Sequence, residues 1–147
     1  MPIPPLSEKS QPLKQSGIRS ASTRCAAIGG INLGQGVCDL PIVDPIKLAA
    51  IEAINHDKSQ YSACEGVARL RHVLSQKLVD FNQLKANPDT EILITHGATG
   101  GFICAVNTLF NPGDEVILFE PFYGYHKGIL DLHGIGVVAH APHGNAR

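Results

Sequence analysis

The sequence predicts an α/β fold in which a parallel β-sheet carries helices on both faces. Three short stretches, EILIT, VILFE and GVVAHA, are rich in apolar residues and contain little polar interruption. A strand of this kind is buried on both of its sides, which is typical of parallel sheets. Segments with helical character alternate with these strands, as the crossover connections of a parallel sheet require.

The composition is that of an ordinary globular chain, and it excludes several classes of function. The chain has 147 residues and a net charge of −1, so we expect one domain or part of a larger one. This balance provides no basic face for nucleic acid. The longest apolar runs are shorter than the roughly 18 residues that a membrane span needs. The proline-rich start, MPIPPLSEKSQPLKQSG, lacks a signal-peptide core and is interpreted as an extended, flexible arm.

The cysteines and histidines predict neither a disulfide framework nor a metal site. The cysteines are scattered without a Cys-x-x-Cys pair, at Cys25, Cys38, Cys64 and Cys104. Reduced thiols in a cytoplasmic protein are therefore expected. His140 and His143 have no third ligand nearby in the sequence, so no metal is assigned to them.

Two helices are expected in the first half of the chain. Asp44 suits the N-cap of a helix that continues to about Asn55, with proline at its first position. A second helix is expected after Gly66, because apolar residues recur there at steps of three and four. Arg69 and Arg71 on this helix are interpreted as surface charges.

The second half alternates between strands and helices. A strand at Glu91–Thr95 leads into a segment after Gly97 that is apolar nearly all round, as in a buried helix. A strand at Val116–Glu120, a helix at about Tyr125–Leu132 and a final strand at Gly136–Ala141 follow. Ligands of parallel sheets bind beyond the carboxyl ends of the strands.

The turn HGATGG lies at such a carboxyl end and is the candidate binding site. A helix N-terminus has free N–H donors and a partial positive charge, so Gly97, Ala98 and Thr99 suit an anion, phosphate in particular. The glycine spacing matches neither the dinucleotide fingerprint nor the P-loop. Taken alone, the turn is equally compatible with a tight β–α turn whose glycines only relieve crowding.

Four stretches together resemble the class I and II aminotransferases, which depend on pyridoxal phosphate and have fold type I. They are INLGQGVCDLP, QYSACEGVARLR, ITHGATGGF and NPGDEVILFEPFYGYH, in this order and spacing. The resemblance implies a partial three-layer α/β/α large domain, whose first, incomplete part occupies residues 46–147. Residues 1–45 would form the N-terminal arm and a segment of a small domain.

The resemblance implies cofactor contacts at two places in the chain. Gly97, Ala98 and Thr99 match the loop whose backbone amides, with a hydroxyl, hold the cofactor phosphate. Tyr123 matches the aromatic residue that stacks on the pyridine ring and excludes water from it. Without the other motifs, Tyr123 would be interpreted as a packing residue.

Two further positions are implied at the edge of the site. Tyr61 matches a tyrosine that, in the family's homodimer, reaches the phosphate in the neighbouring subunit. The family usually has a proline at or beside the position of Cys64, so the loop differs here. Gly36 matches the glycine near the substrate carboxylate, where a bare backbone leaves room for the amino acid. An ordinary turn glycine is the alternative.

The residues that perform the family's reaction are not matched. The family uses a lysine that forms a Schiff base with the cofactor, and no lysine of this chain has the required sequence context. Lys127, the lysine nearest the cofactor motifs, is interpreted as a solvated residue. No arginine matches a substrate-binding position; the arginines are Arg19, Arg24, Arg69, Arg71 and Arg147. The resemblance also implies unpaired strand edges, because strands from later sequence lie between those seen here.

We therefore expect an N-terminal fragment of a cytoplasmic, pyridoxal-phosphate-dependent aminotransferase. The complete enzyme would move an amino group from an amino acid to a 2-oxo acid as a homodimer. This chain alone would be inactive, and its retention of the cofactor is left open. The motifs do not separate an aminotransferase from a lyase of the same fold. A non-catalytic module that pairs with an intact paralogue is the other alternative.

Overall fold

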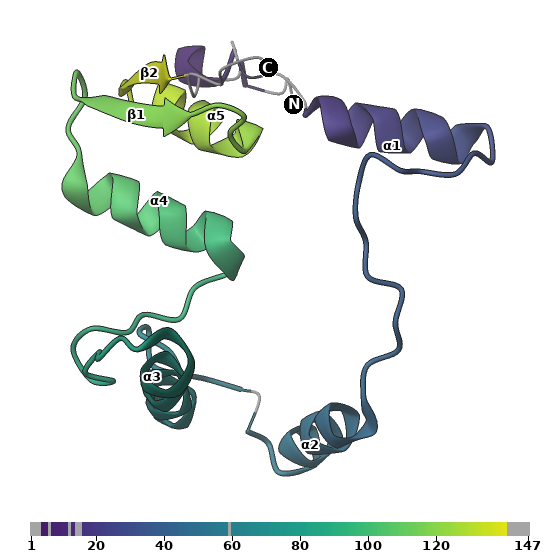
Figure 1. Ribbon diagram of the computed structural model, residues 1–147, viewed down its shortest axis with the longest axis vertical. Coiled ribbons are helices and arrows are strands. Elements are labelled where there is room, and N and C mark those ends of the chain that lie inside the picture. The colour runs from purple at the N-terminus through teal and green to yellow at the C-terminus, as the bar shows by residue number, and fades with distance from the viewer. Residues whose placement is uncertain (1–3, 6, 12, 14–15, 59, 141–147) are drawn as a thin grey trace, which may run out of the picture. The chain divides into compact units, whose positions relative to one another are not determined.

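The computed structural model describes residues 4–5, 7–11, 13, 16–58 and 60–140, and Figure 1 labels its elements. In chain order these are η1 (Glu8–Ser10), α1 (Gly17–Ala27), α2 (Asp44–Asn55), α3 (Ala68–Asn82), α4 (Gly97–Leu109), β1 (Glu115–Phe119), α5 (Gly124–Leu132) and β2 (Gly136–His140). The chain divides into two compact units. The first unit comprises residues 1–36 and 102–147, and the second comprises residues 37–101.

The first unit contains a two-stranded parallel sheet. β1 pairs with β2 in a register that runs from Glu115 opposite Gly136 to Phe119 opposite His140. Helix α5 connects the two strands and contacts β2 (Figure 1). This β–α–β connection confirms the predicted strands and the predicted helix between them.

The core of the first unit lies on one face of this sheet. Val106 of α4 is 1 % exposed and clusters with Ile129 and Leu130 of α5. The strand residues that pack against this cluster, among them Val116 and Leu118, alternate along β1 with exposed ones. Helices α4 and α5 therefore share one buried apolar cluster with the sheet.

The opposite face of the sheet is not covered by the described residues. Ile117 is 62 % exposed and Phe119 is 71 % exposed, and Val138 on the paired strand is also exposed. Helix α4, which we expected to be buried, is covered only in part, since Leu109 is 69 % exposed. The expected helical layers on both faces are thus present on one face only.

In the second unit, helices α2 and α3 form where the sequence predicts them. Asp44 is the first residue of α2 rather than its N-cap, which is Val43, so that detail of the prediction is wrong. The Asp44 side chain instead lies 3.4 Å from Lys47 Nζ in an exposed pair. As an acidic group in the first turn, Asp44 still interacts favourably with the partial positive charge at the N-terminus of the helix. The apolar side chains of α2, such as Ile46 and Ile54, are exposed.

The predicted strand at Glu91–Thr95 is not formed in this structure. Residues 92–95 carry no strand assignment, because no second strand among the described residues pairs along them. A main-chain hydrogen bond of 3.0 Å from Ile94 N to Glu65 O holds the segment instead. The segment leads directly into α4.

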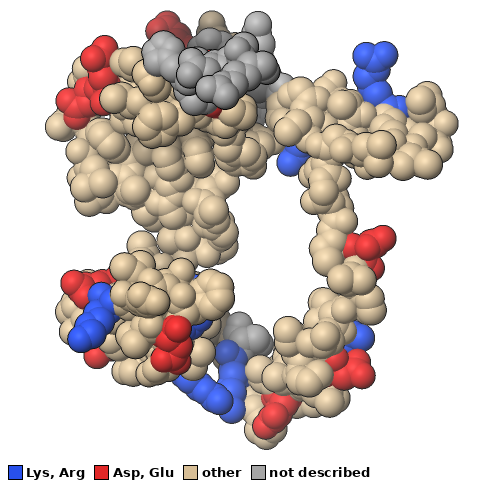
Figure 2. All heavy atoms as spheres, viewed as in Figure 1, with Lys and Arg blue, Asp and Glu red and all other residues tan. Residues whose placement is uncertain are grey.

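Helix α1 was not predicted from the sequence. Its residues GIRSASTRCAA combine few large apolar side chains with several serine and threonine residues, so they carry no apolar periodicity. A stretch without helix or strand, residues 28–43, follows it (Figure 1). None of the helices in the described part of the chain is both long enough and apolar enough to cross a membrane. On the face shown in Figure 2, acidic and basic side chains are scattered among larger uncharged areas.

Candidate functional site

The turn HGATGG, the candidate phosphate-binding site, forms the N-terminus of α4 in the second unit. Gly97 has a φ of +68°, a conformation that glycine adopts without steric cost. Its N–H donates to Thr95 O at 2.8 Å, and the Thr95 hydroxyl donates to Gly97 O at 3.0 Å. The turn is thereby closed at Gly97 by Thr95.

The main-chain N–H groups that follow Gly97 are available to donate hydrogen bonds to a ligand. The first N–H groups of an α-helix have no partner within the helix. Among the described residues, no main-chain acceptor outside α4 is bonded to the N–H of Ala98, Thr99 or Gly100. A Cβ placed on Gly97 would meet no heavy atom within 4 Å, so the space beside the turn is open. These donors and the Thr99 hydroxyl fit a phosphate group, with Gly97 serving the turn rather than the anion.

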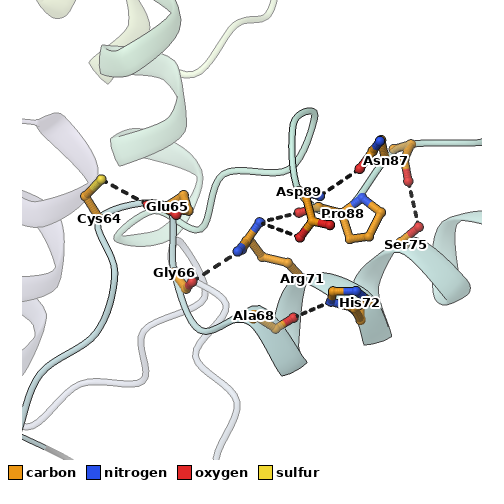
Figure 3. Close-up of polar contacts among 11 residues, drawn as sticks. Cys64, Glu65, Gly66, Ala68, Arg71, His72, Ser75, Asn87, Pro88 and Asp89 are labelled. Atoms are coloured by element: carbon orange, nitrogen blue, oxygen red, sulfur yellow. Dashed lines mark hydrogen bonds and ion pairs between the residues drawn. The ribbon is translucent and has the colours of Figure 1, made fainter.

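A buried arginine supports the segment that leads into this turn. Arg71 of α3 is 6 % exposed, which corrects our interpretation of it as a surface charge. Its Nε donates to Gly66 O at 3.3 Å, and its Nη1 donates to Pro88 O (Figure 3). Nη1 also lies 3.6 Å from a carboxylate oxygen of Asp89. Arg71 thus joins the start of α3 to the turn that precedes residues 92–95.

Two neighbouring contacts of the second unit complete this support. The Ser75 hydroxyl, one turn further along α3, donates to Ala86 O at 2.6 Å (Figure 3). Gly66, whose carbonyl binds Arg71, has a φ of +98° and lies against Ile94. Together with the bond from Ile94 N to Glu65 O, these contacts fix the approach to Gly97 mainly through main-chain atoms.

Tyr61 lies in the loop before Gly66 and is 94 % exposed. No contact between its side chain and Gly97, Ala98 or Thr99 occurs among the described residues. Tyr61 therefore presents its phenol to solvent, where a second molecule has access to it.

An exposed thiol and a half-buried carboxylate form a pair in the same loop. Cys64 Sγ lies 3.1 Å from Glu65 Oε2 (Figure 3). The hydrogen bond to Glu65, and secondly its negative charge, raise the pKa of the Cys64 thiol. The same hydrogen bond lowers the pKa of Glu65, because it stabilises the carboxylate. All four cysteines are free thiols.

In the first unit, Gly36 and Tyr123 line one cavity of about 270 Å³. The cavity lies between the start of α1, the glycine-containing loop before residue 37 and the segment around the start of α5. Its lining residues are Ser16, Ile18, Arg19, Gly34, Gln35, Gly36, Tyr123 and Tyr125. Sequence reasoning selected two of these and missed Arg19, whose helix it did not predict.

Side-chain hydrogen bonds hold the glycine-containing loop on α1. Asn32 Nδ2 donates to Ser22 Oγ at 2.8 Å, and the Ser22 hydroxyl lies 2.9 Å from Gln35 Oε1. Asn32 Oδ1 accepts the N–H of Gly34 at 3.0 Å. The loop that carries Gly36 is therefore fixed to the middle of α1 through Ser22.

Tyr123 belongs to an aromatic cluster. Its ring centroid is 5.2 Å from that of Tyr125 and 5.3 Å from that of His126, which it meets edge-on at 80°. His126 stacks on Phe102 with centroids 4.1 Å apart. Tyr123 itself is 50 % exposed, so part of its ring is available to cover a flat ligand.

A second, larger hollow of about 440 Å³ adjoins this cluster. It shares Ser16, Ile18, Tyr123 and Tyr125 with the first cavity, and Leu13 and Leu132 are among its apolar lining residues. The two hollows thus share four lining residues, and the larger one is the more apolar.

The described lysines are exposed or paired near the chain surface. Lys127, for example, forms an ion pair of 2.7 Å with Asp131 along α5. Lys14 lies outside the described residues, as do Arg147 and His143. No group of three or more metal-binding side chains occurs in the described part of the chain.

Comparisons with known proteins decide the family. The sequence profile of "Aminotransferase class I and II" matches residues 28–144. The chain belongs to this family. YugH of Bacillus subtilis, assigned to the aminotransferases, is 32 % identical over 136 residues, which are 92 % of this chain and 35 % of that protein.

Solved structures agree with this family in sequence and in fold. N-succinyldiaminopimelate aminotransferase from Mycobacterium tuberculosis is 31 % identical, with a TM-score of 0.87 over 95 % of this chain and 37 % of that one. YbdL from Escherichia coli, with a methionine aminotransferase function, is 28 % identical and has a TM-score of 0.85 over 95 % of this chain and 36 % of that one. The fold is therefore a part of fold type I, and the family is one that depends on pyridoxal phosphate.

The chain spans about a third of the length of these aminotransferases. The structure places Gly97, Ala98, Thr99 and Tyr61 in the second unit, and Gly36 and Tyr123 in the first. It brings Gly36 and Tyr123 to one cavity, and it leaves Tyr61 without contact to the turn.

Proposed function

We propose that this chain carries part of the cofactor and substrate sites of a pyridoxal-phosphate-dependent aminotransferase. The complete enzyme would transfer an amino group between an amino acid and a 2-oxo acid, as a homodimer in the cytoplasm. The supporting observation is the turn at Gly97, where the next three amides have no main-chain acceptor outside α4 among the described residues and the neighbouring space is open.

Each proposed role is the one that the family resemblance implies, and the local geometry of the residue is compatible with it. The amides of Ala98 and Thr99 and the Thr99 hydroxyl would bind the phosphate oxygens with charge-assisted hydrogen bonds. Tyr123 is 50 % exposed, and its ring would cover the pyridine ring. The exposed phenol of Tyr61 would donate to the phosphate in the partner subunit of the homodimer.

Gly36 would leave room for the carboxylate of the amino acid. A Cβ on Gly36 would meet no heavy atom within 4 Å, so the cavity is open at this point. When bound, pyridoxal phosphate supplies an electron sink for the substrate carbon. The groups described here would bind and orient it and exclude water from one of its faces.

A binding experiment tests the proposed phosphate site without requiring turnover. Pyridoxamine 5′-phosphate has no aldehyde and so cannot react with lysines, and its binding is followed by phosphorus NMR. Thr99→Ala removes one donor to an anion and is expected to weaken binding by about tenfold. Thr99→Ser keeps the hydroxyl and should restore the affinity.

Thr108→Ala is the matched control. Thr108 is also on α4, but its hydroxyl donates to Cys104 O at 2.8 Å within the helix. Equal losses for Thr99→Ala and Thr108→Ala, or no saturable binding by the unchanged chain, would contradict the proposed site. The coding DNA after codon 147 gives an independent test of the activity. An Asn, Asp-x-x-Tyr and Ser-x-x-Lys series in any frame would support an aminotransferase gene, and its absence would favour a non-catalytic module.

A further inference from the structure

Thr95 holds the turn that precedes α4 through both its main chain and its side chain. Its carbonyl accepts the N–H of Gly97 at 2.8 Å, a bond that spans three residues as in a γ-turn. Its hydroxyl donates to the carbonyl of the same glycine at 3.0 Å. In the described part of the chain, no other side chain forms a hydrogen bond with the main chain of residues 96–100. Both polar groups of Gly97 are therefore bonded to Thr95.

The bond to the Gly97 carbonyl also sets the direction of the next amide. Gly97 O and the Ala98 N–H belong to one planar peptide unit, and the peptide bond between them is trans. In a trans unit the carbonyl and the N–H point in opposite directions. A hydroxyl that holds Gly97 O therefore holds the Ala98 N–H as well, and it directs this donor away from Thr95.

Gly97 needs such a restraint because packing does not fix its conformation. Glycine adopts positive and negative φ with similar ease, and the φ of Gly97 is +68°. A Cβ at this position would meet no heavy atom within 4 Å, so that side of the residue is open. An amide that rotates freely loses conformational entropy when a ligand orders it, whereas an amide that is already fixed does not. The affinity of a ligand at this turn therefore depends on how firmly Gly97 is held.

The Thr95 side chain itself lies in a fixed place against the first turn of α4. Thr95 is half-buried. A Cβ on Gly100 would lie 3.4 Å from Thr95 Cβ, and a Cβ on Gly101 would lie 3.4 Å from Thr95 Oγ1. The threonine is thus a direct neighbour of both glycines. The bond from Ile94 N to Glu65 O anchors the residue before it. The Thr95 hydroxyl therefore acts on Gly97 from a supported position.

We propose that Thr95 is a positioning residue that preorganises the Ala98 N–H to bind the phosphate of pyridoxal phosphate. The inference rests on the proposed function, in which this turn holds that phosphate. Donors that already have the geometry of the complex bind more tightly, because less ordering is needed on binding. Thr95 itself does not contact the phosphate, since its hydroxyl has one hydrogen and donates it to Gly97 O. The two threonines of the turn thus differ, because Thr99 binds the ligand and Thr95 orients the amide.

The test separates the hydroxyl of Thr95 from its shape. Thr95→Val keeps the branched shape and removes the hydroxyl, whereas Thr95→Ser keeps the hydroxyl and removes the methyl group. We expect Thr95→Val to weaken the binding of pyridoxamine 5′-phosphate to the whole chain by about fivefold, measured by phosphorus NMR, because one neutral hydrogen bond is lost. Thr95→Ser should bind within about twofold of the unchanged chain. A role in packing alone predicts the reverse order, and this order would overturn the inference.

The nitrogen-15 order parameter of the Ala98 amide gives a second readout, which needs no ligand. It should fall from about 0.85, the value of a rigid backbone, to about 0.6 in Thr95→Val, and it should remain high in Thr95→Ser. If the Thr95 hydroxyl instead donated directly to the phosphate, Thr95→Val would weaken binding without lowering the order parameter. That result would overturn the role of Thr95 as a positioning residue.

Thr108→Val is the matched control, because the Thr108 hydroxyl donates to Cys104 O at 2.8 Å on the same helix. It should change neither the affinity nor the Ala98 order parameter. Equal effects of Thr95→Val and Thr108→Val would contradict the inference. Urea denaturation of each variant establishes that the affinities are compared at equal folded fractions.

The outcomes distinguish a failure of this inference from a failure of the proposed function. Weaker binding in Thr99→Ala, with unchanged binding in Thr95→Val, would refute only the role of Thr95. No saturable binding of pyridoxamine 5′-phosphate by the unchanged chain would refute the phosphate site and the role of Thr95 together.

Discussion

Gly66 lies in direct contact with Ile94. A Cβ atom on Gly66 would lie 2.4 Å from Cγ1 and 2.5 Å from Cβ of Ile94, closer than non-bonded carbon atoms approach. Both residues belong to the support of the proposed phosphate turn, because Ile94 N donates to the carbonyl just before Gly66. The close approach and the φ of +98° at Gly66 each require glycine.

Gly66→Ala is therefore expected to lower the free energy of unfolding by about 3 kcal/mol or more, measured by urea denaturation. Gly113→Ala separates the two causes. Gly113 has a similar φ of +97° but open space where its Cβ would lie, so we expect a loss of about 1–2 kcal/mol. Equal losses for the two variants would show that the contact with Ile94 is unimportant.

Replacement of Arg71 should be costly, whereas replacement of Arg69 should not. Arg71→Ala leaves the carbonyls of Gly66 and Pro88 without their donor, and we expect a loss of about 2–3 kcal/mol. Arg69 is exposed on the same helix, and Arg69→Ala should change stability by no more than about 0.5 kcal/mol. Hydrogen exchange gives a local readout, because the Ile94 amide should lose protection in the first variant only.

The Cys64–Glu65 pair predicts a pH-dependent reactivity. Glu65 raises the pKa of the Cys64 thiol, so less of the reactive thiolate is present at a given pH. Glu65→Gln should therefore move the midpoint of the alkylation rate of Cys64 to lower pH, measured by mass spectrometry with iodoacetamide. Glu91→Gln removes an acid elsewhere in the second unit and should leave the midpoint in place. An unchanged midpoint in Glu65→Gln would contradict the pairing.

The same pKa shifts give the sign of a stability effect. The raised pKa of Cys64 means that its contribution is complete below the ordinary thiol pKa and is lost as the pH rises through the folded value. The lowered pKa of Glu65 means that its contribution is present above the ordinary carboxyl pKa and is lost as the pH falls through the folded value. The Cys64–Glu65 contact therefore contributes most to stability between the ordinary pKa of a carboxyl group and the ordinary pKa of a thiol.

Pyridoxal phosphate should form no selective covalent adduct with this chain. The lysine nearest the cofactor motifs, Lys127, is exposed and ion-paired with Asp131, so its amine lacks the enclosed setting of a Schiff-base lysine. After borohydride reduction, peptide mapping should show only low labelling distributed over several lysines. Saturable labelling of a single lysine would contradict this prediction, because it would show that the chain contains a lysine that forms the Schiff base.

The sequence predicts those parts of the fold that depend on local patterns. Helices α2 and α3 and the β1–α5–β2 unit have apolar periodicity or compact apolar strands bounded by turns. Residues 92–95 have the same apolar character, but a strand also needs a partner, and none pairs with them here. Helix α1 has no apolar periodicity, and its side-chain contacts include those of Ser22 with Asn32 and Gln35 of the loop that follows it.

The candidate site is predictable in part for the same reason. The Gly97 turn is a local motif, so its place at the start of α4 follows from the sequence. The engagement of the Gly97 N–H by Thr95, the burial of Arg71 and the position of Arg19 beside Gly36 depend on contacts in space. No spacing in the sequence indicates that Arg71 meets Pro88 and Asp89 or that Gln35 meets Ser22.

The contact between Gly66 and Ile94 limits how this region can change in evolution. The bond between Glu65 and Ile94 uses main-chain atoms, so it survives most side-chain replacements at either position. A residue other than glycine at position 66 would still collide with the Cβ of an alanine at position 94. Only a simultaneous change to glycine at position 94 would relieve the collision, and that double substitution would have to pass through a destabilised intermediate. We therefore expect relatives that share this packing to vary in the neighbouring side chains and to retain the glycine.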